Sequence, residues 1–325
     1  MPTDGSGTES AAAPVIQEED ATAPRPRLPD AANWPPGATG GEAFHYMVEA
    51  TLAALTDHRP AAVACEAEGV HQMRVAVRRL RAVLATFDPD LPGEAEDRFK
   101  ASLRRLGRIL GEARDWDVFI TEVLPAAAVD GVPIQDLARL EKAARQFRAA
   151  AQPSLRAAVS GPGFANTVES ISAWAQDAAD PSSPQGRGRL ARPARKLAPR
   201  LQKRLARTVL QRGRHIRRRS ETELHELRKA LKRLRYGVEL LAPLHESGRK
   251  TFRRACQSLQ EKLGALNDAV VAAELTRRLE ADDPSLAPQA KALRAWTRTR
   301  RERAMAGTPA AWRVFKKVEL PRLAV

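Results

Sequence analysis

Apolar residues recur every three or four positions along the chain from about residue 41 onward, which is the spacing of helices that bury one face. The alternation of apolar and polar residues that marks strands is absent. The pattern therefore predicts an all-α fold. The expected helices cover residues 41–58, 70–87, 95–112, 115–128, 134–158, 164–178, 190–214, 221–242, 248–265, 267–280 and 285–305.

A break in the helical pattern separates two halves that resemble each other. Residues 70–81 align with residues 224–235 without a gap, at an offset of 224 − 70 = 154. A second match follows between residues 106–115 and 259–268, at an offset of 153. Two matches in the same order predict an internal duplication with a pseudo-twofold relation. The predicted organisation is a first half at 40–180, a Pro/Ser/Gly-rich linker at 181–188 and a second half at 189–305.

Each half contains a helix whose polar face is almost entirely basic. On a helical wheel the apolar residues of 70–87 and of 221–242 form one face, and the cations form a row on the other. The spacing i, i+3, i+7 and i+10 gives each row a length of about 15 Å at 1.5 Å rise per residue. The first row is His71, Arg74, Arg78 and Arg81, and the second is His225, Arg228, Lys232 and Arg235, with Lys229 beside it.

These rows predict an anion-binding role. Like charges three or four positions apart on a helix cost roughly 0.2–0.5 kcal/mol per pair. The first row contains no acid, and Glu239 lies at the edge of the second. An anion that bridges the cations would remove the repulsion and add charge-assisted hydrogen bonds. The alternative is a solvated charged face, and for His71 and His225 a capping role or a buried core role.

The overall charge agrees with a polyanionic partner. The chain has 54 Lys and Arg against 39 Asp and Glu, a formal net charge of +15, which attracts polyanions. Aromatic residues make up only 5% of the chain, so side chains on which bases could stack are scarce. Weaker candidates for contacts with the same anion are Arg79, Arg105, Arg108, Arg200, Lys203, Arg204, Arg207 and Arg233.

The ends of the chain are expected to be tails. Residues 1–39 are rich in Pro, Ala, Gly and acids and predict a disordered segment, and residues 306–325 a C-terminal tail. Residues 1–20 lack the basic residues and the apolar run of a signal peptide. No stretch approaches the roughly 18 apolar residues of a membrane-spanning helix. Together with two widely separated cysteines, Cys65 and Cys256, these features predict a cytoplasmic protein without membrane insertion.

Signatures of catalysis are missing. The sequence has no Gly-rich phosphate loop and no zinc-type spacing among its six histidines. Asp115 and Asp117 form a short acidic pair, but the second half keeps only Asp268, with Val270 at the other position. We expect Asp115 and Asp268 to cap helices or to pair with basic neighbours. The prediction is a binding protein without catalytic residues, metal or cofactor, and not an enzyme.

The paired motifs resemble the CHAD domain family. Residues 70–81, followed by Leu110-Gly111-x-x-Arg114-Asp115, look like the first half of a CHAD domain. Residues 224–236, followed by Leu263-Gly264-x-x-Asn267-Asp268, look like the second half. The resemblance covers about residues 40–305. It implies two four-helix bundles around a basic central surface or pore, binding of inorganic polyphosphate, and association with polyphosphate granules.

The resemblance also implies ligand contacts and partners. The implied contacts are the two rows of cations, from His71 to Arg81 and from His225 to Arg235. Family members are often fused to a CYTH-type triphosphate hydrolase domain, whose Glu-x-Glu-x-Lys strand is not found in this sequence. We therefore expect hydrolysis to need separate polyphosphate-metabolising enzymes.

Two other functions fit part of the pattern. A nonspecific nucleic-acid-binding protein would also be basic, but Tyr236 is the sole aromatic residue that interleaves the basic runs. An accessory enzyme that processes polyphosphate or triphosphate would need a metal site that the sequence does not reveal.

Overall fold

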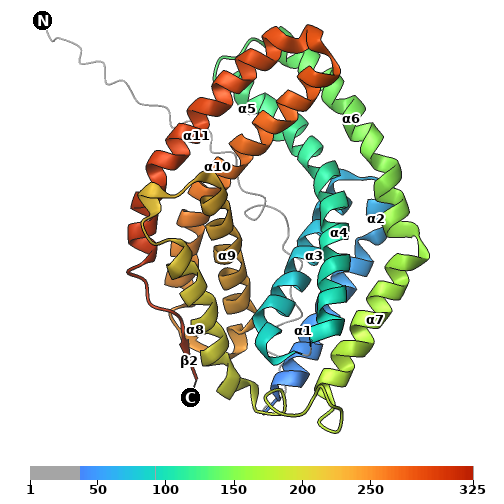
Figure 1. The fold of residues 1–325 in the computed structure, drawn as a ribbon, viewed down its shortest axis with the longest axis vertical. Helices are drawn as coiled ribbons and strands as arrows, with labels where there is room; N and C mark the ends of the chain where they lie inside the picture. Colours follow the sequence, from blue (N-terminus) through green and yellow to red (C-terminus); the bar gives the residue numbers. More distant parts are fainter. Residues whose placement is uncertain (1–36, 92, 325) are drawn as a thin grey trace, which may run out of the picture.

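The computed structural model of the protein describes residues 37–91 and 93–324, and almost all of this part is helical (Figure 1). The predicted all-α fold is therefore confirmed. The expected tail at 1–39 lies almost wholly outside the described residues. The helices are α1 Gly40–Asp57, α2 Arg59–Val63, α3 Ala67–Phe87, α4 Gly93–Val118, α5 Leu124–Val129, α6 Ile134–Ser160, α7 Pro162–Ala179, α8 Ala194–Arg212, α9 Glu221–Leu240, α10 Arg249–Asp282 and α11 Ala287–Phe315.

Three helical boundaries differ from the sequence prediction. A π-helical turn at Phe119–Val123 joins α4 to α5. The predicted break near residue 266 is wrong, because α10 runs through it as one continuous helix. The helix expected from residue 190 begins at Ala194 instead. The carbonyl oxygens of Leu190 and Arg192 accept hydrogen bonds from the amides of Gly41 and Gly40, so this segment pairs with the start of α1.

The C-terminal boundary also needs correction. Helix α11 continues past residue 305 to Phe315, because Ala311, Trp312 and Phe315 are buried against α8–α10. Beyond it, β2 (Arg322–Leu323) pairs with β1 (His245–Ser247) in a small antiparallel sheet. The expected tail from residue 306 is therefore largely packed onto the second half of the chain.

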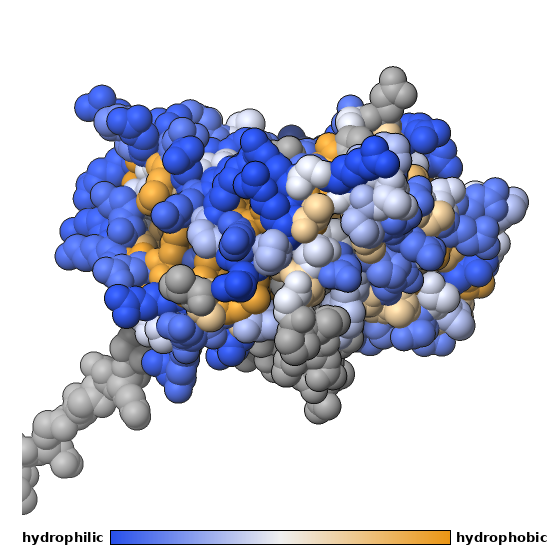
Figure 2. Space-filling view, turned by 90° about the horizontal axis from the view of Figure 1, so that it is seen from below, coloured by the Kyte–Doolittle hydropathy of each residue, from blue (hydrophilic) through white to orange (hydrophobic). Residues whose placement is uncertain are grey.

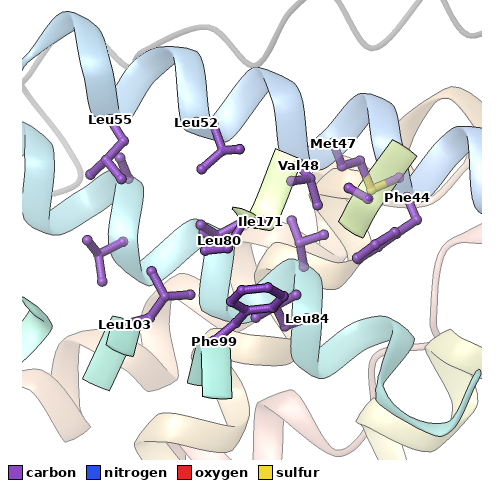
Figure 3. Close-up of a cluster of buried hydrophobic side chains, with 14 of the residues drawn as sticks. Phe44, Met47, Val48, Leu52, Leu55, Leu80, Leu84, Phe99, Leu103 and Ile171 are labelled. Atoms are coloured by element: carbon purple, nitrogen blue, oxygen red, sulfur yellow. The ribbon is translucent and has the colours of Figure 1, made fainter. Parts of the chain in front are cut away.

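Three hydrophobic clusters hold the helices together. The first lies among α1, α3, α4, α7 and the start of α8, with Phe44, Leu80, Leu84 and Phe99 near its centre (Figure 3). The second joins α8, α9, α10 and the end of α11. The third combines the end of α4, α5 and α6 with the adjoining parts of α10 and α11.

The clusters show how the two halves of the chain meet. In Figure 1, α8–α11 form one side of the molecule and α1–α7 the other. The two sides meet at one end through the third cluster, and at the other end the start of α8 packs into the first cluster. Both contacts link distant parts of the sequence and fix the distance between the sides. The internal duplication itself stays a prediction.

No helix within residues 37–91 and 93–324 is long and apolar enough to cross a membrane.

Gly41 provides a test of the contact between α1 and α7. A Cβ atom there would lie 1.9 Å from the carbonyl oxygen of Ala178, which is backbone and cannot rotate away. We expect Gly41→Ala to lower the free energy of unfolding by about 1–3 kcal/mol, the usual cost of overpacking, in urea titrations. Gly163→Ala is the matched control because no atom lies within 4 Å of its added Cβ. Equal stability of both variants would contradict the packing described here.

Candidate functional site

A cavity of about 330 Å³ lies between α3, α4, α9 and α10, where the two sides of the molecule face each other. Its wall contains nine cationic side chains and three carboxylates. The cations are Arg74, Arg78, Arg81, Lys100, Arg104, Arg228, Lys229, Lys232 and Arg233. The carboxylates are Asp115, Glu122 and Asp268. Both predicted basic helices therefore face one shared space.

Helix α3 presents three arginines to the cavity because its other face is buried. Val70, Met73 and Leu80 are each at most 1% exposed in the first cluster. Two glycines of α4 leave room for the arginines. A Cβ atom on Gly111 would lie 3.7 Å from Arg74 Nε, and one on Gly107 would lie 3.8 Å from an Arg81 guanidinium nitrogen.

Helix α9 presents a different face from the one that its predicted row suggests. The helix begins with a capping box, in which Ser220 and Glu223 each accept a hydrogen bond from the other's backbone amide. Its cavity residues are Arg228, Lys229, Lys232, Arg233 and Tyr236. The spacing of these residues, i, i+1, i+4, i+5 and i+8, defines one face of α9. Compared with the predicted row, this face is turned about the helix axis so that it excludes Arg235. Arg235 is buried and pairs with Glu239, with 3.0 Å between Nη1 and Oε1.

Two arginines from two other helices lie close enough to Arg81 to repel it. The pKa of Arg81 is lowered from its usual value, first by burial and then by the positive charges of Arg233 and Arg104. The side chain of Arg81 still has solvent-exposed surface, since the cavity is open to water. The cavity thus concentrates positive charge from α3, α4 and α9.

The carboxylates of Asp115 on α4 and Asp268 on α10 each lie near an arginine of the helix beside them, α3 and α9 respectively. Arg74 Nη2 lies 3.8 Å from Asp115 Oδ1, and Arg228 Nη2 lies 4.0 Å from Asp268 Oδ1. Both aspartates lie inside their helices. Of the two expected roles, capping a helix is therefore wrong, and pairing with a basic neighbour is confirmed.

Lys100, on α4, contributes to the cavity wall and also contacts two carboxylates, Asp88 just after α3 and the buried Glu96 on α4. Its ammonium group forms ion pairs with Asp88 and with Glu96, the latter at 2.9 Å. Burial raises the pKa of Glu96 to about 7, and the negative charge of Asp88 acts in the same direction. At neutral pH the protonation of Glu96 therefore decides how much negative charge lies beside Lys100.

Comparison with known proteins agrees with this geometry. The family model of the CHAD domain matches residues 46–277. The chain belongs to the CHAD domain family. No curated protein sequence matches the chain significantly.

Two solved structures share the fold. The crystal structure of the CHAD domain from the plant Ricinus communis is 26% identical, with a TM-score of 0.77 over 89% of this chain and 95% of that one. PptA from Streptomyces chartreusis is 18% identical, with a TM-score of 0.63 over 85% of this chain and 100% of that one. The second likeness concerns the fold alone.

The CHAD fold gathers seven of the predicted contact residues around the cavity and places the others elsewhere. The gathered residues are Arg74, Arg78, Arg81, Arg228, Lys229, Lys232 and Arg233. His71 is buried in α3 and is 5% exposed, outside the cavity wall. His225 is exposed, and its Nδ1 lies 2.8 Å from Asn267 Oδ1. The histidines therefore lie behind or beside the cavity, together with Arg235.

The weaker candidates other than Arg233 lie outside the cavity wall. Arg204 donates hydrogen bonds to the carbonyls of Ala85 and Thr86 and so holds the end of α3. Arg200 pairs with Asp90 at 3.0 Å. The others are Arg79 on α3, Arg105 and Arg108 on α4, and Lys203 and Arg207 on α8.

Sequence reasoning missed Lys100 and Arg104 as cavity residues. Both share a face of α4 with Gly107, at i, i+4 and i+7. Buried Leu103 and Leu110 mark the neighbouring apolar face, so a helical wheel of α4 would have separated Arg104 from Arg105.

Neither surface polarity nor volume alone identifies the site. Hydrophilic residues also cover most of the end of the molecule seen in Figure 2. A larger hollow of about 560 Å³ lies between α1, α4 and α7, but Arg105 is the one charged residue in its lining. The central cavity is distinguished by its concentration of cations.

Removing one cation from the cavity should relieve repulsion in the unliganded protein. We expect Arg81→Gln to raise the free energy of unfolding by about 0.5 kcal/mol at low salt, as expected for a lost like-charge contact. In urea titrations the gain should shrink in 1 M salt, where charges are screened within about 3 Å. Arg105→Gln, outside this cavity, is the control. A loss of stability in Arg81→Gln at low salt would contradict the electrostatic account.

The raised pKa of Glu96 makes stability depend on pH. The folded protein binds this proton more tightly than the unfolded chain, in which the pKa is near its ordinary value of 4.5. The contribution of Glu96 to the free energy of unfolding therefore falls as pH rises from 4.5 to about 7, and is constant above that. We expect the free energy of unfolding, measured by urea titration at several pH values in this interval, to change less with pH in Glu96→Gln than in the unchanged protein. The same dependence on pH in both proteins would refute the assignment.

Proposed function

We propose that the protein binds inorganic polyphosphate in the cavity between α3, α4, α9 and α10. The observation that carries the proposal is the convergence of nine cations against three carboxylates on one wall. Membership of the CHAD domain family, which is linked to polyphosphate binding in general, supports the same ligand. A linear polyanion can contact cations from both sides of the molecule at once.

Binding would be favoured because the ligand relieves the repulsion among cations that the fold holds close together in the cavity. Phosphate oxygens that bridge Arg81, Arg104 and Arg233 would replace repulsion with attraction, and arginine can donate two parallel hydrogen bonds to a phosphate. Release of counterions from the polyanion would make the affinity fall as salt rises. Recognition rests on charge density and phosphate geometry, so we propose specificity for polyphosphate chains.

Nucleic acid remains a competitor in this proposal. Its backbone would be attracted by the same charges, but unstacked bases need aromatic platforms. The cavity wall offers two aromatic rings, those of Phe119 and Tyr236. We therefore propose that polyphosphate is preferred. Displacement of bound polyphosphate by duplex DNA at equal phosphate concentration would reverse this order.

We further propose a binding role without catalysis, at polyphosphate granules, with turnover of the polymer left to separate enzymes. Within the described part of the chain no group of three or more His, Cys, Asp and Glu side chains is placed to hold a metal ion. Release of phosphate from polyphosphate by the purified protein with Mg²⁺ or Mn²⁺ would contradict this part of the proposal.

Charge reversal in the cavity tests the site. The double variant Arg228→Glu, Lys232→Glu should bind long-chain polyphosphate at least about a hundredfold more weakly in isothermal titration calorimetry, since two charge-assisted contacts are lost. The stabilisation by ligand, about 2.7 kcal/mol at 100 times Kd, should largely disappear.

The matched control is Lys203→Glu, Arg207→Glu, which makes the same change in net charge on an exposed face of α8 outside the cavity. Circular dichroism checks that both variants are folded. Equal losses of affinity in the two double variants would show that net charge, and not this cavity, governs binding.

A further inference from the structure

Tyr236 lies between the two basic helices and forms part of the cavity wall. The residue belongs to α9 and is 4% exposed. The guanidinium carbon of Arg78, from α3, lies 5.7 Å from the centre of its ring, and that of Arg235 lies 4.6 Å away. Contacts of cations with the ring hold the phenol between the two rows of positive charge.

The hydroxyl group of Tyr236 is buried and has no hydrogen-bond partner among the described residues. A buried hydroxyl normally has a partner, since leaving it without one costs free energy. The charged groups that contact its ring are guanidinium groups, which donate hydrogen bonds and do not accept them. An acceptor for the hydroxyl proton must therefore come from outside this pair.

Two other large aromatic side chains have unpartnered polar atoms, but their surroundings differ. The indole nitrogens of Trp116 and Trp174 are also buried without a hydrogen bond. Both rings pack against phenylalanines inside hydrophobic clusters, and neither belongs to the cavity wall. Of these three residues within the described chain, Tyr236 alone combines a buried unpartnered donor with a place in the cationic cavity.

We propose that the Tyr236 hydroxyl donates a hydrogen bond to a phosphoryl oxygen of the bound polyanion. This inference rests on the proposed function and assigns a neutral donor to a site otherwise described by charge. The arginines and lysines neutralise the phosphates, whereas the phenol adds a directional contact at the junction of α3 and α9. Phosphoryl oxygens suit this position because they accept hydrogen bonds and are attracted by Arg78.

The test is Tyr236→Phe, which removes the hydroxyl oxygen and keeps the ring between the arginines. Affinity for long-chain sodium polyphosphate in calorimetry should fall by about tenfold, near the lower end for a hydrogen bond to a charged acceptor. The melting temperature without ligand should stay the same or rise, because no intramolecular hydrogen bond is lost. Tyr46→Phe, on α1 and outside the cavity, should change neither quantity.

The outcomes separate this inference from the proposed function. If the unchanged protein does not bind polyphosphate, the proposed function fails and this inference fails with it. If Arg228→Glu, Lys232→Glu loses binding while Tyr236→Phe keeps full affinity, the cavity assignment stands and the role of Tyr236 is refuted. A lower melting temperature of ligand-free Tyr236→Phe would also refute it, since the hydroxyl would then have a structural partner.

Discussion

Repulsion among cations held close together is the constraint on which the properties of the cavity depend. Burial and the positive charges of Arg233 and Arg104, which come from two other helices, lower the pKa of Arg81. The fold tolerates this because a like-charge contact costs roughly 0.2–0.5 kcal/mol, whereas a fully buried leucine contributes about 1.5–3 kcal/mol. The apolar faces of α3 and α9 lie mainly in two separate hydrophobic clusters, so their basic faces are kept together by the third cluster at one end and by the start of α8 in the first cluster at the other.

The carboxylates in the wall moderate this repulsion without cancelling it. Asp115 and Asp268 occupy matching positions in the two related motifs. Asp115 lies near Arg74, and Asp268 lies near Arg228, which is the residue that aligns with Arg74. At 3.8 and 4.0 Å, the atoms of these two pairs lie farther apart than in a direct hydrogen bond. A ligand with dense negative charge competes with these carboxylates better than a sparsely charged one.

The sequence predicts a cavity residue where the pattern of one helix is enough to place its side chain. It fails where packing between several helices sets the position of the side chain. On α3 the predicted cations at 74, 78 and 81 all line the cavity, because that helix buries its opposite face. On α9 the predicted row included Arg235, but the packing of α9 on its neighbours turns that side chain inward. The cavity is lined instead by Lys229, predicted beside the row, and by Arg233, predicted as a weaker candidate, together with Arg228 and Lys232. Lys100 and Arg104 were missed as cavity residues because the apolar spacing of α4 separates its faces but does not say which polar face opposes α3 and α9.

The sequence by itself determined the helical class, the buried faces of α3 and α9, and the two related basic motifs. These features depend only on residues within a few turns of one helix. Over that distance, a spacing of three or four positions predicts which side chains share a face. The tertiary structure alone decided that both basic helices line one cavity, that α10 is continuous and that α11 extends to Phe315. It also decided that His71 is buried and that Asp115 and Asp268 face arginines instead of capping helices. The reason is that these outcomes depend on the distance between elements far apart in the chain, which is fixed by packing in the shared third cluster and by the docking of α8 on α1.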